Sequence, residues 1–107
     1  MDATFAALAD PTRRGILEKL SRGDLSVGEL VEAFPISQSA VSRHLQVLEH
    51  AGLVTRRREG QRRLCRLNGA PLDEAGDWMA RYREVWEARL QCLEGLLADG
   101  VDQERDA

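Results

Sequence analysis

Cysteine, histidine and long apolar runs are scarce in this sequence of 107 residues. Its two cysteines, Cys65 and Cys92, cannot form a disulfide framework, and we expect both to be reduced thiols. No apolar run approaches the length that spans a bilayer, and the first residues lack the basic and apolar regions of a secretory signal. These absences predict one small domain over residues 1–107 that is cytoplasmic and has no membrane contact.

Catalytic patterns are scarce as well. The sequence has no Ser/His/Asp set, no Cys/His pair at a plausible spacing, no glycine-rich phosphate loop and no convincing pair of carboxylates. We therefore predict a protein that is not an enzyme and needs no cofactor.

Charge is distributed unevenly along the chain. The formal net charge is -3, but residues 1–69 carry +3 and residues 70–107 carry -6. The local field, rather than the net charge, decides whether a surface attracts phosphate. Only Glu59 opposes the basic cluster within its own stretch, so repulsion among the arginines favours a polyanionic partner. The cluster consists of Arg56, Arg57, Arg58, Arg62, Arg63 and Arg66.

Apolar spacing and capping signals predict a mainly α-helical fold with a small β-hairpin. Asp10 before Pro11 breaks the first helical stretch, and Ser26 with Glu29 has the spacing of a capping box. The expected elements are a broken helix over 3–20, a short helix over 26–34, a helix from Ser37 to about 50, strands over 53–58 and 62–67, a last helix over about 72–98, and an acidic tail over 99–107 that frays.

The helices on either side of Pro35 form a helix-turn-helix, and the hairpin that follows is the wing of a winged helix-turn-helix. A helical projection divides the second helix into two faces. The apolar face contains Ala40, Val41, His44, Leu45, Val47 and Leu48. The other face carries short hydrogen-bonding groups, which suit base edges better than the Glu and Lys of a solvated helix. We predict that base edges are read by Gln38, Ser39, Ser42, Arg43 and Gln46.

His44 belongs to the apolar face. We expect it to be partly buried, hydrogen-bonded to the backbone and without a catalytic role. Glu49 lies on the polar face, at the end where a recognition helix leaves the DNA groove.

Four motifs follow one another along the chain: Ala-Asp-Pro-Thr-Arg-Arg at 9–14, Ser-Arg-His-Leu at 42–45, Ala-Gly-Leu-Val at 51–54 and Arg-Arg-Glu-Gly at 57–60. Together they resemble the ArsR/SmtB family of bacterial winged-helix repressors, and the match covers about residues 3–98. The resemblance implies a repressor that binds imperfect inverted repeats in double-stranded DNA as a homodimer. Phosphate contacts are then expected from Thr12, Arg13, Ser37, Arg57, Arg58, Arg62 and Arg63.

Many members of this family release DNA on binding a metal, but the resemblance fails at their metal sites. Where the family has Cys-Val-Cys-Asp-Leu, this sequence has Ser-Val-Gly-Glu-Leu over 26–30. The family's second site uses Asp and His of the last helix, and the last helix here has no histidine. Soft metals need clustered thiolates or imidazoles, so we predict no metal site in the family's positions.

The last helix is apolar over a surface too broad for one winged core to cover. Two apolar faces imply two contacts, one with its own domain and one with a second subunit. The resemblance places the first helix at the same interface. We expect the dimer to be formed by Leu8, Met79, Tyr82, Trp86, Leu90, Leu93 and Leu97.

Two alternatives remain open at this point. One is a repressor released by thiol oxidation, at Cys65 or Cys92, or by a small apolar ligand at the dimer interface. The other is a winged helix that binds protein, although such a module has no need of six arginines beside a Gln/Ser/Arg helix face.

Overall fold

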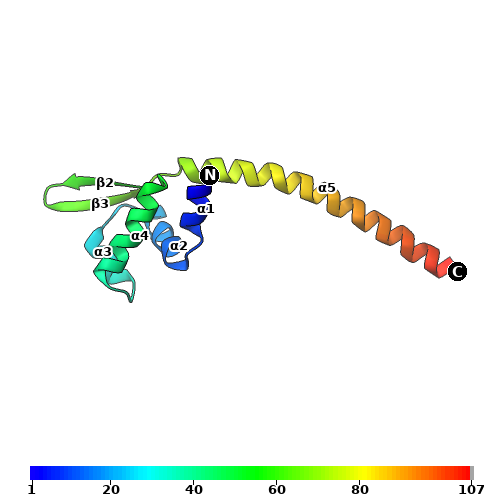
Figure 1. Cartoon of the computed structure of the whole chain (residues 1–107), viewed down its shortest axis with the longest axis horizontal. Helices are drawn as coiled ribbons and strands as arrows, with labels where there is room; N and C mark the ends of the chain where they lie inside the picture. The colour runs from blue at the N-terminus through cyan, green and yellow to red at the C-terminus, as the bar shows by residue number, and fades with distance from the viewer. Residues whose placement is uncertain (107) are drawn as a thin grey trace. The chain divides into compact units, whose positions relative to one another are not determined.

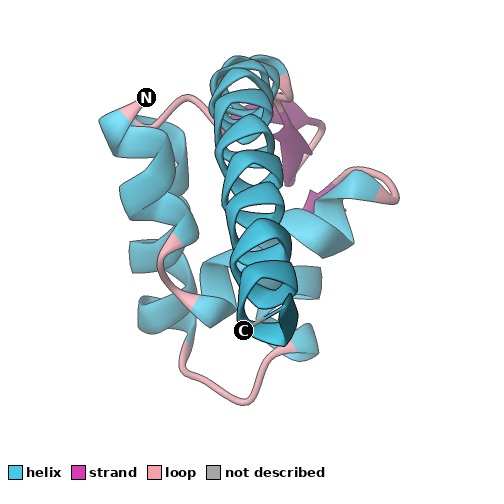
Figure 2. Ribbon diagram, turned by 90° about the vertical axis from the view of Figure 1, so that its right-hand side faces the viewer, coloured by secondary structure: helices cyan, strands magenta, loops and turns pink. Residues whose placement is uncertain are grey.

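The computed structural model describes the backbone of residues 1–106 and the side chains of residues 1–97. Its elements are α1 (Asp2–Leu8), α2 (Pro11–Ser21), β1 (Leu25–Ser26), α3 (Val27–Ala33), α4 (Gln38–His50), β2 (Val54–Glu59), β3 (Arg62–Leu67) and α5 (Ala70–Asp106) (Figure 1). Helices predominate and the strands are confined to one small sheet (Figure 2), so the predicted fold class is confirmed. The chain forms two compact units, Met1–Ala75 and the part of α5 from Gly76 onward.

Local capping determines where three of the helices begin, as predicted. The Asp10 carboxylate accepts the Arg13 amide at 3.0 Å and caps α2, with Pro11 at the first helical position. Ser26 and Glu29 form a reciprocal capping box at α3. The Ser37 hydroxyl accepts the Ala40 amide at 3.2 Å and begins α4. Each such cap contributes about 1 kcal/mol to helix stability.

The sheet has three antiparallel strands in the order β1-β3-β2, not the two that were expected. The additional strand, β1, pairs Leu25 with Cys65 and Ser26 with Leu64. In the hairpin, Glu59 pairs with Arg62 across a two-residue turn. The turn begins at Gly60 with φ +64°, the positive angle that type II′ turns require at that position.

The core lies in the first unit, where α2, α3, α4 and the sheet meet. Its largest fully buried side chains are Ile16, Leu30, Val41, Leu45, Leu48, Leu53 and Cys65. Each fully buried Leu or Ile contributes about 1.5–3 kcal/mol relative to an exposed one. Three of them, Val41, Leu45 and Leu48, come from α4, so the orientation of α4 is determined by its apolar stripe. Val47 was expected on the apolar face and is exposed instead, because it lies at the edge of the stripe.

Helix α5 begins two residues before the expected range of 72–98 and continues to Asp106. Its first turns belong to the first unit, where Ala75 is buried and Leu72 packs against the core. The predicted frayed tail, 99–107, lies outside the residues whose side chains are described. No helix within the described part of the chain is long and apolar enough to cross a membrane.

Candidate nucleic-acid interface

The polar face predicted for α4 is present at the surface of the first unit. Gln38, Ser39, Arg43 and Gln46 are exposed and Ser42 is half-buried. All five side chains come from one helix whose opposite side is packed into the core, so they form one rigid array of donors and acceptors. Arg43 and Gln46 also line a groove of about 410 Å³ that is shared with Ala3 and Ala6 of α1.

Ser37, which was expected to contact phosphate, is exposed, and its hydroxyl caps α4. Its hydroxyl accepts the Ala40 amide and lies 3.1 Å from the hydroxyl of Ser39. Thr12 is half-buried in the first turn of α2, behind the Asp10 cap. These two hydroxyls mark the amino ends of α4 and α2, where helix dipoles favour anions.

Carboxylates from other parts of the fold neutralise much of the positive charge of the wing. The expectation that Glu59 alone opposes the arginines is therefore corrected. Asp24 lies 3.3 Å from a guanidinium nitrogen of Arg57 and 3.2 Å from one of Arg66. Two further ion pairs join Arg62 to Glu29 of α3 and Arg56 to Glu49 of α4. Sequence reasoning missed this role of Asp24, since its partners are 33 and 42 residues away.

Two wing arginines remain without a carboxylate partner among the residues whose side chains are described. Arg58 and Arg63 are both exposed and lie opposite each other in the β2–β3 register. A shallow depression on the hairpin is lined by them together with Arg56 and Arg57. Two like charges directly opposed in a sheet destabilise it, so this pair favours the binding of an anion.

The side chain of Arg13, expected to contact phosphate, joins α1 to α2 and α4. Its Nε donates to the Ala7 carbonyl at 2.7 Å, and its two terminal nitrogens donate to the Ala6 carbonyl at 3.0 Å and to His44 Nδ1 at 3.4 Å. The guanidinium thus binds the last carbonyls of α1. The neighbouring Arg14 donates to the Leu8 carbonyl at 2.8 Å.

His44 is half-buried as expected, but its partners are side chains rather than backbone. Nδ1 lies 3.4 Å from Arg13 and 3.9 Å from the Asp10 carboxylate. Hydrogen bonds from the backbone, chiefly from Arg13, and the nearby charges hold the pKa of Asp10 below its ordinary value of 3.8.

Ser26, at the first of the family's two thiolate positions, is used to cap α3. The Ser26 hydroxyl accepts the Glu29 amide at 3.1 Å, and Glu29 accepts the Ser26 amide at 3.3 Å. These hydrogen bonds, followed by the Arg62 charge, hold the pKa of Glu29 below its ordinary value of 4.5. A serine hydroxyl that caps a helix and a glycine do not fit a soft metal. No cluster of three possible metal ligands occurs among the described residues.

The two cysteines differ in environment. Cys65 lies in β3 and is fully buried, and burial raises the pKa of its thiol although Arg56 acts in the opposite direction. Cys92 is exposed on α5. Cys65 therefore packs in the core, whereas Cys92 lies at the surface of α5.

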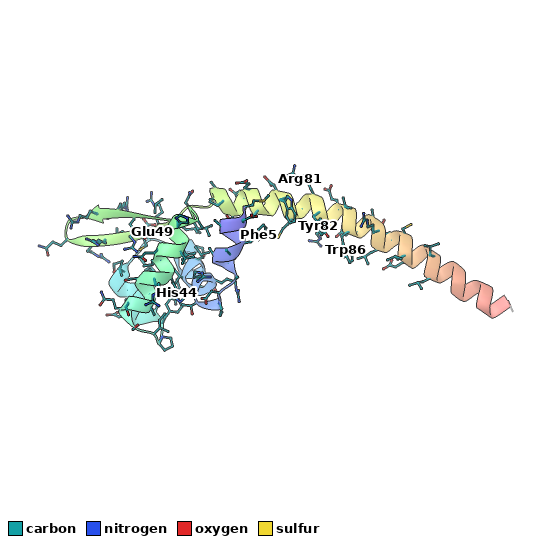
Figure 3. The ribbon with its side chains drawn as sticks, viewed as in Figure 1. Phe5, His44, Glu49, Arg81, Tyr82 and Trp86 are labelled. Carbon is teal, nitrogen blue, oxygen red and sulfur yellow. The ribbon has the colours of Figure 1, made fainter. Side chains whose placement is uncertain are left out.

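The second unit, a segment of α5, has seven large apolar side chains whose exposed fractions lie between 47% and 68%. Trp78 and Tyr82 stack with ring centroids 5.6 Å apart. Tyr82 and Trp86 point to one side of α5 and Arg81 to the other (Figure 3). The exposed set contains Met79, Tyr82, Val85, Trp86, Leu93, Leu96 and Leu97, and Leu90 is 38% exposed. Leu8 of α1, also expected at the interface, is half-buried against the core.

Comparison with known proteins finds similarity over most of the chain. Residues 10–56 match a family model described as bacterial regulatory protein, arsR family. The transcriptional repressor SdpR of Bacillus subtilis is 38% identical over 82 residues, which cover 77% of this chain and 91% of SdpR. An HTH-type transcriptional regulator of Mycobacterium tuberculosis is 51% identical over 67 residues, or 63% of each chain. The solved structure of an ArsR-like transcriptional regulator from Rhodococcus sp. RHA1 has a TM-score of 0.75 at 34% identity, covering 89% of this chain and 90% of that one.

Proposed function

The chain belongs to the arsR family of bacterial regulatory proteins, and from this membership we propose a cytoplasmic transcriptional repressor that binds an imperfect inverted repeat as a homodimer. Its relatives are transcriptional regulators, so the prediction that it is not an enzyme is confirmed. The observation that carries the proposal is the exposed polar face of α4, together with Arg58 and Arg63 of the wing, which have no carboxylate partner among the described side chains.

The two surfaces have different tasks in this proposal. The recognition helix lies in the major groove in this proposal. Arg43 donates two hydrogen bonds to guanine, and Gln38 or Gln46 pairs with adenine. Arg58 and Arg63 bind phosphate, which adds affinity without sequence preference. Thr12 and Ser37 support them at the amino ends of their helices, whereas Arg13 is reserved for the α1–α2 junction.

The dimer is proposed to form through α5. Its exposed apolar side chains include Tyr82 at 61% and Leu93 at 52% exposure, values that a stable monomer in water rarely retains over a continuous surface. A second copy, related by a two-fold axis, covers the same surface on both chains. It also brings a second recognition helix to the other half of an inverted repeat, about 34–36 Å away.

We further propose that release from DNA does not depend on a metal. Ser26 and Gly28 stand at the thiolate positions, and the Ser26 hydroxyl serves as a helix cap. Titration with zinc, cadmium or arsenite should leave the DNA affinity of the fully reduced protein unchanged. A Cys92→Ser variant provides the control, because Cys92 of two chains in a dimer is the remaining source of paired thiolates. A response of wild type that this variant lacks would contradict the proposal.

Sequencing the DNA that copurifies with the protein tests the main proposal. We expect enrichment of an inverted repeat whose half-sites are about one helical turn apart. Binding is then measured on that duplex and on one with a shuffled sequence, at equal length and salt. Equal affinity for both duplexes would leave a non-specific binder, and no affinity for either would favour a protein-binding winged helix.

A further inference from the structure

His44 is a polar residue of the recognition helix that is half-buried and contacts residues of α2 and its cap rather than lying on the proposed DNA face. It comes directly after Arg43, so the two side chains project from α4 in different directions. Arg43 is exposed and His44 is half-buried. A change in the contacts of His44 therefore affects the same turn of α4 that carries Arg43.

The contact of His44 is made with a guanidinium that is itself immobilised. Arg13 donates to the carbonyls of Ala6 and Ala7 as well as to His44 Nδ1. The imidazole thereby connects α4 to the end of α1 and the start of α2 through one cation. No apolar substitute reproduces this connection, since an aliphatic side chain offers no acceptor.

A hydrogen bond from Arg13 requires one particular protonation state of His44. A guanidinium only donates hydrogen bonds, so Nδ1 must carry a lone pair and the ring proton must lie on Nε2. The alternative, a salt bridge from a protonated Nδ1 to Asp10, spans 3.9 Å and places the imidazolium charge 3.4 Å from Arg13. The shorter contact corresponds to the neutral ring.

We infer that His44 is a positioning residue for DNA reading, and that it holds α4 in register through Arg13 only while its imidazole is neutral. This inference rests on the proposed function of α4. Protonation removes the acceptor and creates a like-charge contact with Arg13, and it leaves the imidazolium to turn toward Asp10. The recognition helix then loses one of its side-chain connections to α1 and α2, on the turn that presents Arg43.

Three carboxylates near α4 have partners of their own. Asp10 accepts the Arg13 amide as the cap of α2, Glu29 of α3 pairs with Arg62, and Glu49 of α4 pairs with Arg56 of β2. The α1 segment beside Arg13 offers backbone carbonyls. Asp10 is thus the one carboxylate among the described side chains that the structure places within ion-pair distance of His44.

The expected consequence is a loss of specificity in mild acid. The added positive charge of His44 raises attraction to every phosphate, so total affinity is a poor measure. The ratio of affinity for the recovered operator to affinity for a shuffled duplex isolates the positioning effect. The chain has only one other histidine, His50, which serves as the control.

The experiment compares wild type with His44→Asn, His44→Leu and His50→Asn, near pH 8 and pH 5.5 at matched ionic strength. Asparagine keeps a neutral acceptor at all pH values, and leucine removes it. The wild-type ratio should fall about tenfold on acidification, comparable to the loss of one hydrogen bond to a charged group. His50→Asn should behave as wild type. His44→Asn should keep its ratio at both pH values, and His44→Leu should be low at both.

A wild-type ratio that does not change with pH, or an asparagine variant that loses specificity in acid as wild type does, would overturn the inference. If the leucine variant fails to fold, nitrogen NMR of wild type still decides the question without DNA. It should show the Nε2–H tautomer of His44 near pH 8, and an Nδ1–H tautomer would exclude the contact with Arg13. Absence of any DNA binding near pH 8 would instead reject the proposed function.

Discussion

Arg58 and Arg63 face each other across the β2–β3 pair near the end of the wing, with no carboxylate partner among the described side chains. The other four arginines of the cluster are paired with Asp24, Glu29 or Glu49. One set of wing arginines thus attaches the hairpin to the rest of the fold, and the other set is the one that we propose binds phosphate.

Replacing Arg63 with Thr should change folding and DNA binding in opposite directions. The free energy of unfolding should rise by about 0.2–1 kcal/mol, because the like-charge pair is removed. Affinity for every DNA sequence should fall, and the salt slope should decrease by about one unit. Urea unfolding and binding at several salt concentrations measure both. In the control Arg66→Thr, which breaks a pair with Asp24, unfolding should become easier. Lower stability of the Arg63 variant would contradict the assignment.

Replacing Arg43 with Ala should affect specificity rather than general affinity. We expect a loss of about 1–3 kcal/mol at the base pair that Arg43 reads, and little change on shuffled DNA. A set of operators that differ at single positions measures the effect. Arg22→Ala is a matched control, because that exposed guanidinium pairs with Glu18 on α2. An equal loss on all duplexes would make Arg43 a phosphate contact.

Replacing Trp86 with Asp should convert the proposed dimer to monomer, since the change would bury an unpaired carboxylate at its interface. Sedimentation at micromolar concentration gives the mass. Arg81→Gln, on the other side of α5, should leave the dimer intact (Figure 3). Wild type that sediments as a monomer would reject the proposed interface.

The Asp10 cap should make the first unit sensitive to acid. Because the pKa of Asp10 is lowered in the folded state, its stabilising effect is present above the ordinary value of 3.8 and is lost as pH falls through the lower, folded value. Asp10→Asn keeps a capping acceptor, so its melting temperature should fall less between about pH 6 and pH 3 than that of wild type. An identical decrease in both proteins would assign the acid sensitivity to other carboxylates.

The two thiols should react at very different rates with an alkylating reagent. Cys65 is fully buried, and burial raises the pKa of its thiol, so it is neither accessible nor ionised in the folded protein. Mass spectrometry of the native protein should show modification at Cys92, and at Cys65 only after denaturation. Rapid labelling of native Cys65 would indicate that the sheet opens readily.

Local signals were sufficient for the elements that begin with a cap. Asp10, Ser26 and Ser37 each bond an amide three residues ahead, so the information lies within one turn of helix. The face of α4 was predictable for a similar reason, apart from Val47, because helical periodicity places Val41, Leu45 and Leu48 together.

Features that depend on distant partners were not predictable in the same way. β1 is two residues long and has no alternating pattern of its own, and it becomes a strand only through Cys65 and Leu64 of β3. The neutralisation of Arg57 and Arg66 by Asp24, and the contact of His44 with Arg13, join residues more than 30 positions apart. Composition therefore overstated the free positive charge of the wing.

Ser26 has two structural roles at once, since it pairs with Leu64 of β3 and its hydroxyl caps α3. The wing cannot shift relative to the helix-turn-helix without breaking one of these two attachments. In the proposed complex, the recognition helix and the hairpin would therefore approach DNA at a fixed separation, and little conformational entropy would be lost in ordering the wing on binding. Operators whose groove geometry departs from that separation are then rejected by the stiffness of the protein, in addition to any mismatch at their bases.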